Sequence, residues 1–415
     1  MKIRCALVFG GRSVEHEISV ISALQAAQSL DREKYDVIPV YMTKDNIFLT
    51  GPEVGNIEAY RDIKTLTSSS DPVYFIRENG RVFIKKAKHR AFSDDTVSEI
   101  DIVLPVVHGT NLEDGCLQGY FHTLGVPFAG CEVLSSAMGM DKAVMKSVLK
   151  QAGIPVLDCI EFTAADYSDP DAIINRIVSE LGYPVIIKPV NLGSSVGIKK
   201  GYDEASLRDA VDLAFTFSRR ILAEHSIEDL KEINCSVLGD TDSAEASECE
   251  EPLGSGEILS YTDKYMSGGK GAKTSGSKAS SSGAGARSAP AGAKMSGGKS
   301  GMASLQRKIP ADIDPSVRDR VRSLAVDTFK ALQCSGVARI DFMLDQKDNS
   351  LYVNEINTIP GSLSFYLWEP VGLPYGDLLD RVIDLAFKRA RLDEKVTYSF
   401  DTNVLENAHI GQRGK

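Results

Sequence analysis

Two short segments near the carboxyl-terminal end carry charged and amide side chains at alternating positions. Arg339 and Asp341 alternate with apolar residues in Ala-Arg-Ile-Asp-Phe, and Glu355 and Asn357 do so in Asn-Glu-Ile-Asn. Successive side chains of a strand point to opposite faces, so a hairpin of the two segments would gather all four on one face. Carboxylate and amide oxygens are the ligands that Mg²⁺ prefers. The pattern predicts a magnesium site; the alternative is that the two carboxylates only form ion pairs with Arg339 on an exposed sheet face.

A second group of candidates surrounds a Gly/Ser loop. Lys188 ends an apolar strand just before the loop that begins with Gly193, Ser194 and Ser195. A cation and several backbone N–H groups at one place can bind phosphates. A Walker P-loop is excluded, because its Gly-Lys-Ser/Thr ending and its following helix are absent. Such a loop is more often only a turn, and Lys142, which begins a predicted helix, would in most proteins be solvated.

Single charged residues near the ends of predicted strands complete the candidates. Glu224 and Glu232 flank a connection that ends in a strand, where carboxylates could meet an adenine and a ribose hydroxyl; a solvated acidic surface is the alternative. Glu15 and His108 each follow an apolar strand, so both belong to the edge of a cleft. Either of these two could instead be a helix cap or a satisfied group of the core.

The elements that must position these groups begin with a βαβ pattern. Residues 3–9 predict a strand, residues 19–30 an amphipathic helix, and residues 35–42 a second strand. With a further apolar strand at residues 100–107, they predict a small parallel sheet whose strand ends face a ligand cleft.

A helix that Asp141 caps opens the next part of the chain. Its expected apolar stripe is Met140, Val144 and Val148, and Gly153 ends it. A second domain begins about here.

The remaining pattern predicts strands on both sides of the Gly/Ser loop and a later helix and hairpin. A strand covers residues 183–189, a helix residues 315–332, and two strands residues 338–344 and 351–356. Residues 267–302 consist mainly of Gly, Ser, Ala and Lys, with six basic residues and no acidic one. This composition predicts a mobile loop or linker that is inserted inside a domain.

Length and composition place the chain among ordinary globular proteins. Its 415 residues predict two or three domains, and a 43% hydrophobic and 25% charged composition is typical of a soluble protein. No apolar run approaches the roughly 20 residues of a membrane helix. The first residues enter an apolar strand with no cleavage site after it, which indicates the cytosol rather than secretion.

Cysteines and net charge exclude further classes of protein. The seven cysteines are odd in number, scattered and without a Cys-x-x-Cys pair, which argues against a disulfide framework and a zinc site. A net charge of −10 disfavours binding of a nucleic-acid backbone over a broad surface.

From about residue 3 to residue 390, the order and spacing of these segments resemble the D-alanine–D-alanine ligases of the ATP-grasp superfamily. The motifs that carry the resemblance are Phe-Gly-Gly-Arg-Ser-Val-Glu-His-Glu-Ile-Ser (9–19), His-Gly-Thr-Asn-Leu-Glu-Asp-Gly (108–115), Met-Asp-Lys (140–142), Gly-Ser-Ser-Val-Gly (193–197), Ala-Arg-Ile-Asp-Phe (338–342) and Asn-Glu-Ile-Asn-Thr-Ile-Pro-Gly (354–361). Six motifs in family order are far more specific than any one of them.

The resemblance implies an α/β (α+β) ATP-grasp fold of three domains. A Rossmann-like parallel-sheet substrate domain would cover residues 1–130, and two ATP-grasp domains that clamp the nucleotide would cover residues 131–222 and 223–395. The insert at 267–302 then lies in the last domain, and residues 396–415 form a tail.

The resemblance also implies the reaction and its requirements. The family forms D-alanyl-D-alanine from two D-alanines and ATP, through a D-alanyl phosphate, for peptidoglycan precursors of the cell wall. It implies two Mg²⁺ ions, with Mn²⁺ as the alternative metal, and a cytoplasmic homodimer without nucleic-acid or membrane partners.

Roles carry over from the family to matching positions in four groups. The first D-alanine would be bound by Glu15, Ser195 and His108, and the developing oxyanion would be stabilised by Arg339. The ATP phosphates would be bound by Lys142, Lys188, Gly193 and Ser194, and the adenine and ribose by Glu224 and Glu232. The metal ions would be held by Asp341, Glu355 and Asn357.

Two departures from the family leave the lid and the second substrate open. Lys264 and Tyr265 match the family's tyrosine-rich loop, but the Gly/Ser/Lys insert follows them directly. After Gly361, the family usually has a serine near position 366 for the second carboxylate, and here Ser362 or Ser364 could replace it. D-serine, D-lactate or another small amino acid is therefore the alternative second substrate.

Two other readings compete with a ligase. A non-catalytic nucleotide-binding protein could use the basic insert to contact an acidic partner, although it would not need every metal and phosphate residue. A Rossmann oxidoreductase is the weaker alternative of the two, because Gly10 and Gly11 do not begin a Gly-x-Gly-x-x-Gly motif.

Overall fold

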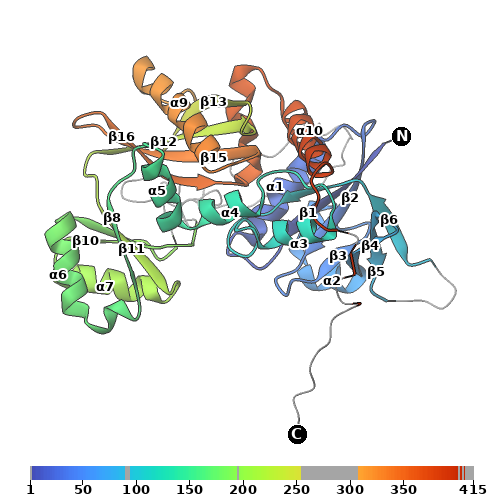
Figure 1. The fold of residues 1–415 in the computed structure, drawn as a ribbon, viewed down its shortest axis with the longest axis horizontal. Coiled ribbons are helices and arrows are strands. Elements are labelled where there is room, and N and C mark those ends of the chain that lie inside the picture. Colours follow the sequence, from blue (N-terminus) through green and yellow to red (C-terminus); the bar gives the residue numbers. More distant parts are fainter. Residues whose placement is uncertain are drawn as a thin grey trace, which may run out of the picture.

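Three β-sheets with helices packed on them form the protein (Figure 1). The structure, a computed structural model, describes residues 2–88, 94–193, 196–253, 307–400, 402–403 and 406. The insert at 267–302 and most of the predicted tail therefore lie outside the described residues. We call the sheets N-terminal, central and C-terminal in chain order.

The N-terminal sheet has seven strands in the order β6-β5-β4-β3-β2-β1-β7. Its strands are β1 (Ile3–Gly10), β2 (Tyr35–Met42), β3 (Phe48–Thr50), β4 (Asp71–Glu78), β5 (Arg81–Lys86), β6 (Thr96–Ile100) and β7 (Ile102–Val106). Strand β1 runs parallel to β2 and β7, as the βαβ pattern predicts, whereas β3 to β6 extend the sheet in antiparallel fashion. The parallel part of the sheet is therefore limited to three strands.

The predicted strand at residues 100–107 is wrong in one respect, because Asp101 divides it. Asp101 accepts hydrogen bonds from the Arg4 backbone N–H and guanidinium, so it separates β6 from β7. Strands β6 and β7 are the two edge strands of the sheet, yet only one residue separates them in the chain. The sheet must therefore curl until its two ends meet.

Helices around the N-terminal sheet come from both ends of the chain. They are α1 (His16–Ser29), α2 (Ile63–Ser69), α3 (Cys116–Leu124) and the short η1 (Ile57–Arg61), with α10 (Tyr375–Asp393) packed on α1. Leu378, Leu379 and Val382 of α10 belong to the same core as Leu7 and Val8 of β1. The last helix therefore returns to the first sheet, as Figure 1 shows.

The central sheet is small and antiparallel, in the order β10-β9-β11-β8. It contains β8 (Cys159–Thr163), β9 (Val185–Pro189), β10 (Lys199–Gly201) and β11 (Arg220–His225), with η2 (Asp166–Ser168), α6 (Pro170–Leu181) and α7 (Glu204–Phe215). Strands β9 and β10 pair as a hairpin, which confirms that the Gly/Ser loop joins two strands. The predicted domain boundary at residues 222 and 223 falls inside β11.

The C-terminal sheet has five antiparallel strands in the order β14-β13-β12-β15-β16. These are β12 (Leu230–Gly239), β13 (Ala244–Pro252), β14 (Arg307–Lys308), β15 (Gly336–Asp345) and β16 (Ser350–Asn357), with α9 (Pro315–Ala331), η5 (Gly361–Leu367) and η6 (Glu369–Val371). Helix α9 confirms the helix predicted at residues 315–332.

Helices α4 (Val133–Met140) and α5 (Lys142–Gln151) connect the sheets (Figure 1). Asp141 caps α5 as expected, because its carboxylate accepts from two N–H groups of the first turn. The predicted apolar stripe is wrong at Val144, which is 40% exposed, but Val148 packs against the core of the C-terminal sheet as predicted. Met145 and Leu149, which the prediction leaves out, are fully buried in that core. The inner face of α5 also buries lysines, which a pattern of apolar residues cannot reveal.

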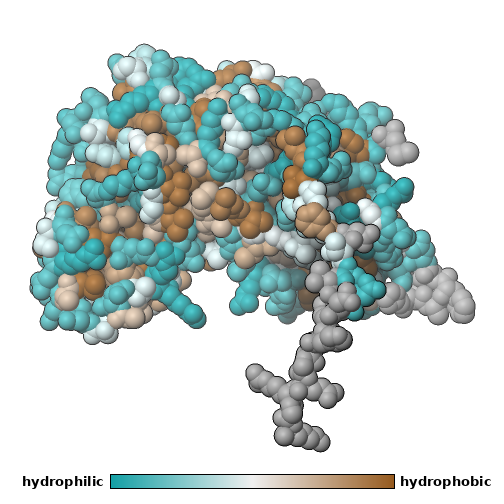
Figure 2. All heavy atoms as spheres, viewed as in Figure 1, coloured by the Kyte–Doolittle hydropathy of each residue, from teal (hydrophilic) through white to brown (hydrophobic). Residues whose placement is uncertain are grey.

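The surface is mainly hydrophilic, and its outline is indented between the central sheet at the lower left and the N-terminal sheet at the lower right (Figure 2). Within the described ranges, every helix is too short or too polar to cross a membrane.

Candidate active site

Strands β15 and β16 place the four candidate residues of the late hairpin together. Asp341 lies opposite Glu355 in the ladder, and Arg339 lies opposite Asn357. The hairpin and its shared face are therefore confirmed. The face is not exposed, because Arg339 keeps only 8% of its surface accessible.

Arg339 and Asp341 form a two-pronged ion pair along β15. The guanidinium Nε and Nη2 donate to the two Asp341 oxygens at 2.6 and 2.7 Å, and the Asn357 amide donates to Asp341 Oδ2 at 3.1 Å. Burial works against the charge of Arg339, but the Asp341 carboxylate outweighs it and raises the pKa of Arg339. The guanidinium is thus a fixed cation at the mouth of the hairpin.

Lys142 joins α5 to both the hairpin and the Gly/Ser loop. Its Nζ lies 3.1 Å from Glu355 Oε2 and donates to the Leu192 carbonyl at 2.8 Å. The side chain is 6% exposed, so it is not the solvated lysine that helix starts usually carry.

A buried cluster of two lysines and one glutamate lies beside the loop. The Glu224 carboxylate pairs with Lys188 and Lys146, each at 2.6 Å, and Lys188 also donates to Asn354 at 3.0 Å. Burial alone would raise the pKa of Glu224, but the two ammonium groups outweigh it and lower the pKa to about 2. Glu224 is thus an anion in the interior, and the alternative of a solvated acidic surface is wrong for it.

Glu15 reaches the same region from the N-terminal sheet. A methyl group on Gly109 would lie 2.8 Å from Glu15 Oε2, and one on Gly193 would lie 3.6 Å from it. Gly109 has a φ of +82°, so its lack of a side chain permits this close approach of the loops. One small cavity is lined by residues of several of these segments, among them Glu15, Glu113, Lys142, Gly193, Glu355 and Asn357.

His108 and Glu113 tie the loop after β7 to the end of β16. His108 Nδ1 lies 2.8 Å from the Ile359 carbonyl, and Glu113 accepts from the Ile359 N–H at 2.9 Å and from the Gly109 N–H at 3.1 Å. Burial lowers the pKa of His108, so the ring is neutral. Burial, reinforced by the charge of Glu15, raises the pKa of Glu113 to about 8.

Comparison with known proteins bears on what this arrangement does. Residues 4–131 match the family model described as D-ala D-ala ligase N-terminus, and residues 148–281 and 298–384 match the one described as D-ala D-ala ligase C-terminus. The chain belongs to the D-alanine–D-alanine ligase family.

Named relatives of this ligase family cover nearly the whole chain. A D-alanine–D-alanine ligase of Thermosipho africanus is 36% identical over 404 residues, which are 97% of this chain and 98% of the relative. One of Caldicellulosiruptor bescii is 37% identical over 403 residues, 96% of this chain and 99% of the relative.

Solved structures of family members have the same fold. The D-alanine-D-alanine ligase of Coxiella burnetii matches with a TM-score of 0.72 and 29% identity, covering 95% of this chain and 98% of that one. The VanG D-Ala:D-Ser ligase of Enterococcus faecalis gives the same TM-score and identity, covering 93% and 100%. The mixed α/β, ATP-grasp fold expected of a D-alanine–D-alanine ligase is thereby confirmed.

The ligase family uses ATP and a divalent metal, and the described residues fit such a metal. Two carboxylates and one amide of the β15–β16 hairpin form a hard oxygen set. No group of three or more His, Cys, Asp or Glu side chains in the described ranges could hold a metal, so the amide of Asn357 is needed to complete this set.

Several predicted residues stand apart from this cluster or outside the described ranges. Ser194, Ser195, Lys264 and Tyr265 lie outside the residues that the structure describes. Glu232 lies half-buried on β12, opposite Met343. Ser362 and Ser364 follow Gly361 in η5, both fully buried and with φ near +50°. The Ser362 hydroxyl donates to Gln25 of α1 at 2.7 Å.

Lys146, Glu113 and Asn354 are site residues that sequence reasoning missed. Lys146 follows Lys142 by four residues on one helix, and this spacing alone indicates that the two lysines share a face. Glu113 and Asn354 lie inside family motifs, but a polar residue in a motif gives no sign that it will be buried.

Proposed function

We propose that this chain joins two molecules of D-alanine to form D-alanyl-D-alanine, with cleavage of ATP to ADP and phosphate. The observation that carries the proposal is the cavity where Glu15, Lys142, Glu355 and Asn357 meet from three parts of the chain. It offers the Glu15 carboxylate for a substrate amine, the Lys142 ammonium for nucleotide phosphates, and oxygen ligands for a metal. Membership of the ligase family supports the same activity.

The first step is phosphoryl transfer to the carboxylate of the first D-alanine. One carboxylate oxygen attacks the γ-phosphorus, the bond to the ADP oxygen breaks, and a D-alanyl phosphate results. Lys142 and Lys188 offset the phosphate charge beside the Gly/Ser loop. Glu224 lies against Lys188 and Lys146 and so holds these ammonium groups in place.

The second step is attack by the amine of the second D-alanine. The nitrogen bonds to the acyl carbon, loses a proton, and phosphate leaves with the electron pair of the C–O bond. Negative charge builds on the acyl oxygen in this step, and Arg339 is the fixed cation for it. Asp341 keeps the guanidinium in one orientation through two hydrogen bonds.

The metal would be held by Asp341, Glu355 and Asn357. We expect two Mg²⁺ ions there, with Mn²⁺ as the alternative metal. When bound, the metal neutralises phosphate oxygens and aligns them. Lys142 and Arg339, which pair with these carboxylates in the structure, reduce the repulsion between the carboxylates before a metal arrives.

The first D-alanine is expected to place its ammonium at Glu15, with His108 beside it. The neutral His108 and the Glu113 carboxyl link the loop after β7 to Ile359, so they keep this side of the site close to β16. We assign Ser194, Ser195, Lys264 and Tyr265 to a lid over the nucleotide, and Glu232 to its adenine–ribose side, on the family resemblance.

A direct assay tests the proposal. Purified protein is incubated with Mg-ATP and D-alanine, alone or mixed with D-serine, D-lactate or L-alanine, and ADP release and product masses are measured. D-alanyl-D-alanine from D-alanine alone supports the proposal. A mixed product only would assign a different second substrate, and nucleotide binding without any turnover would contradict a ligase.

We also propose a domain division, an oligomeric state and a cellular compartment for this chain. We propose domains at residues 1–130, 131–225 and 226–395; the second boundary, predicted at 222 and 223, moves past His225 because β11 pairs with the central sheet up to that residue. We propose a cytoplasmic homodimer that supplies peptidoglycan synthesis. Sedimentation at several protein concentrations tests the dimer.

A further inference from the structure

A row of polar side chains crosses the C-terminal sheet beyond the β15–β16 hairpin. Asp341 of β15 lies opposite Glu355 of β16 on one side and opposite Asn234 of β12 on the other. Asn234 in turn lies opposite Glu250 of β13, and its amide donates to the Glu250 carboxylate at 3.0 Å. Side chains opposite each other in a ladder share a face of the sheet. The polar face of the site therefore extends as far as β13.

Glu250 ends this row in a buried cluster with Arg307 of β14 and Tyr366 of η5. Arg307 Nη1 donates to Glu250 Oε2 at 2.8 Å, and the Tyr366 hydroxyl donates to Glu250 Oε1 at 3.3 Å. The guanidinium carbon of Arg307 lies 3.9 Å from the centre of the Tyr366 ring. A carboxylate and an aromatic face thus hold the guanidinium from two directions.

The cluster adjoins Arg339, the cation assigned to the acyl oxygen. The short helix η5, which carries Tyr366, packs on both β13 and β15. Burial lowers the pKa of Arg339, but the pairing with Asp341 outweighs burial and raises it. Tyr366 and Glu250 raise this pKa further, so both lie within reach of the Arg339 charge. The side chains of Arg307 and Arg339 are each 10% exposed, so neither is sealed in the core.

The second substrate brings a negative charge to this part of the site. The amine and the carboxylate of an α-amino acid are bonded to the same carbon atom, so the second carboxylate arrives close to the acyl carbon that the amine attacks. Taking a carboxylate out of water without a cation is costly. Arg339 already pairs with Asp341 and is assigned to the acyl oxygen. The second carboxylate therefore needs a further cation beside Arg339.

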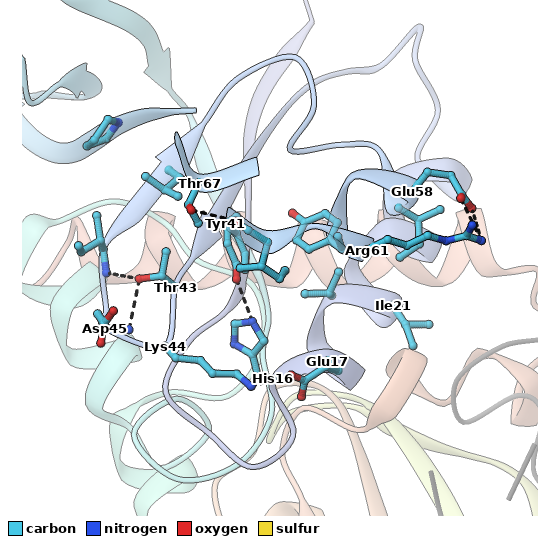
Figure 3. Close-up of a pocket in the computed structure, with 17 residues that line it drawn as sticks. His16, Glu17, Ile21, Tyr41, Thr43, Lys44, Asp45, Glu58, Arg61 and Thr67 are labelled. Carbon is cyan, nitrogen blue, oxygen red and sulfur yellow. Dashed lines mark hydrogen bonds and ion pairs between the residues drawn. The ribbon is translucent and has the colours of Figure 1, made fainter. Parts of the chain in front are cut away.

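The other described cations around the site lie on different sides of it. The lysines on the nucleotide side reach the site from α5 and β9. Arg12 and Lys44 line a cavity with Glu15, toward the N-terminal sheet, and Lys44 pairs there with Glu17 at 2.6 Å (Figure 3). Of the cations in the described ranges, Arg307 is the one that joins the polar row on the β13 side.

We infer that Arg307 binds the carboxylate of the second substrate and so selects a free α-amino acid as the acceptor; the inference rests on the proposed ligase function. A guanidinium carries five N–H donors in one plane, so it can bind Glu250 and a substrate carboxylate together. Glu250 and Tyr366 are positioning residues that hold the guanidinium beside Arg339. An acceptor without a negative charge would lose this contact in a nearly closed site and is therefore rejected.

D-alaninamide tests the inference, because it has the amine of D-alanine but an uncharged amide in place of the carboxylate. It cannot be the first substrate, since it has no carboxylate to phosphorylate. Full-length protein is given Mg-ATP with equal concentrations of D-alanine and D-alaninamide, and the two products, which differ in charge and mass, are quantified. We expect the wild type to prefer D-alanine as acceptor at least about 100-fold. Both products come from the same enzyme molecules, so their ratio does not depend on the fraction of folded protein.

Arg307→Met is expected to lower this preference at least about ten-fold. It should raise the KM for the second D-alanine by a similar factor and leave the KM for the first unchanged. Arg307→Lys keeps the charge and should retain part of the preference. Arg318→Met is the matched control, because Arg318 of α9 pairs at 3.1 Å with Glu248, on the same strand as Glu250, and it should keep the wild-type ratio.

A double variant, Arg307→Met with Glu250→Gln, removes both charges of the pair and replaces the single variant if that one does not fold. We expect the same loss of preference. A wild-type product ratio in either variant would overturn the inference and leave Arg307 as a structural group of β14. An equal change of the ratio in Arg318→Met would overturn it as well. Absence of both products with the wild type would contradict the proposed function itself, and the inference with it.

Discussion

Asp341 and Glu355 lie directly opposite each other in the β15–β16 ladder, yet each carboxylate pairs with a different cation. Arg339 holds Asp341 from the same strand, and Lys142 reaches Glu355 from the start of α5. Two adjacent carboxylates would otherwise repel each other. Each carboxylate is offset by its own cation, and we propose that a divalent metal binds between this guanidinium and this ammonium.

Asp341→Asn is expected to weaken metal use and catalysis together. The variant loses one negatively charged oxygen ligand of the metal. It also loses the carboxylate that accepts two hydrogen bonds from the Arg339 guanidinium. We expect the Mg²⁺ concentration for half-maximal rate to rise at least about ten-fold, and kcat to fall about 100-fold. Steady-state rates across a Mg²⁺ titration measure both quantities.

Asp345→Asn is the control for this change, because it lies at the end of the same strand in a turn. It should leave the Mg²⁺ dependence unchanged. An Asp341→Asn enzyme with the Mg²⁺ dependence of the wild type would show that the hairpin does not hold the metal.

Glu224→Gln is expected to destabilise the fold. The change leaves Lys146 and Lys188, which are 3% and 6% exposed, without their shared anion. Removing one partner of a buried ion pair typically costs about 3–5 kcal/mol. Urea unfolding at pH 7 measures this loss, and Glu228→Gln, whose carboxylate pairs on the surface with Lys347, should cost far less. Equal stability of the two variants would mean that the cluster is not coupled to folding.

The late hairpin could be predicted from sequence because its information is local. Arg339 and Asp341 alternate with apolar residues, and a period of two identifies a strand with one polar face. The capped start of α5 at Asp141 is local as well. These elements therefore appear where the sequence places them.

The burial of Lys146, Glu113 and Glu224 could not be predicted, because it depends on segments far apart in the chain. Lys146 and Glu224 are 78 positions apart in the numbering, which nothing local connects. The same reason explains the wrong prediction at Val144 of α5: the inner face of this helix packs on a sheet whose strands come later. Likewise, only the fold shows that Asp101 pairs with Arg4 and divides a continuous apolar run.

Ser364 and Ser362 can be separated by their effects on the second substrate and on stability. The Ser364 hydroxyl is buried and has no hydrogen-bond partner among the described residues, whereas Ser362 donates to Gln25. If Ser364 contacts the second D-alanine, Ser364→Ala should raise the KM for that substrate about ten-fold and leave unfolding unchanged. Ser362→Ala should instead cost about 1 kcal/mol of stability.

Initial rates over a wide D-alanine range separate the two KM values, and chemical denaturation gives the stability. An unchanged second KM in Ser364→Ala would remove this serine from the substrate site. The replacement for the family serine would then have to come from elsewhere in η5.

Glu113 is expected to make the fold less stable as pH rises toward 8. Burial and the nearby Glu15 raise its pKa to about 8, well above the ordinary glutamate value near 4.3. Between these two values the folded state binds the proton and the unfolded state does not, so the free energy of unfolding falls as pH increases through this window and is level above it. Glu113→Gln cannot titrate, so the fall should be smaller in this variant.

Denaturant unfolding at pH 5, 6, 7 and 8 measures the slope, and the exposed Glu33→Gln should retain the slope of the wild type. If Glu113→Gln and the wild type lose stability in parallel, Glu113 is ionised in the fold throughout this range, and its hydrogen bonds to Ile359 and Gly109 outweigh its burial.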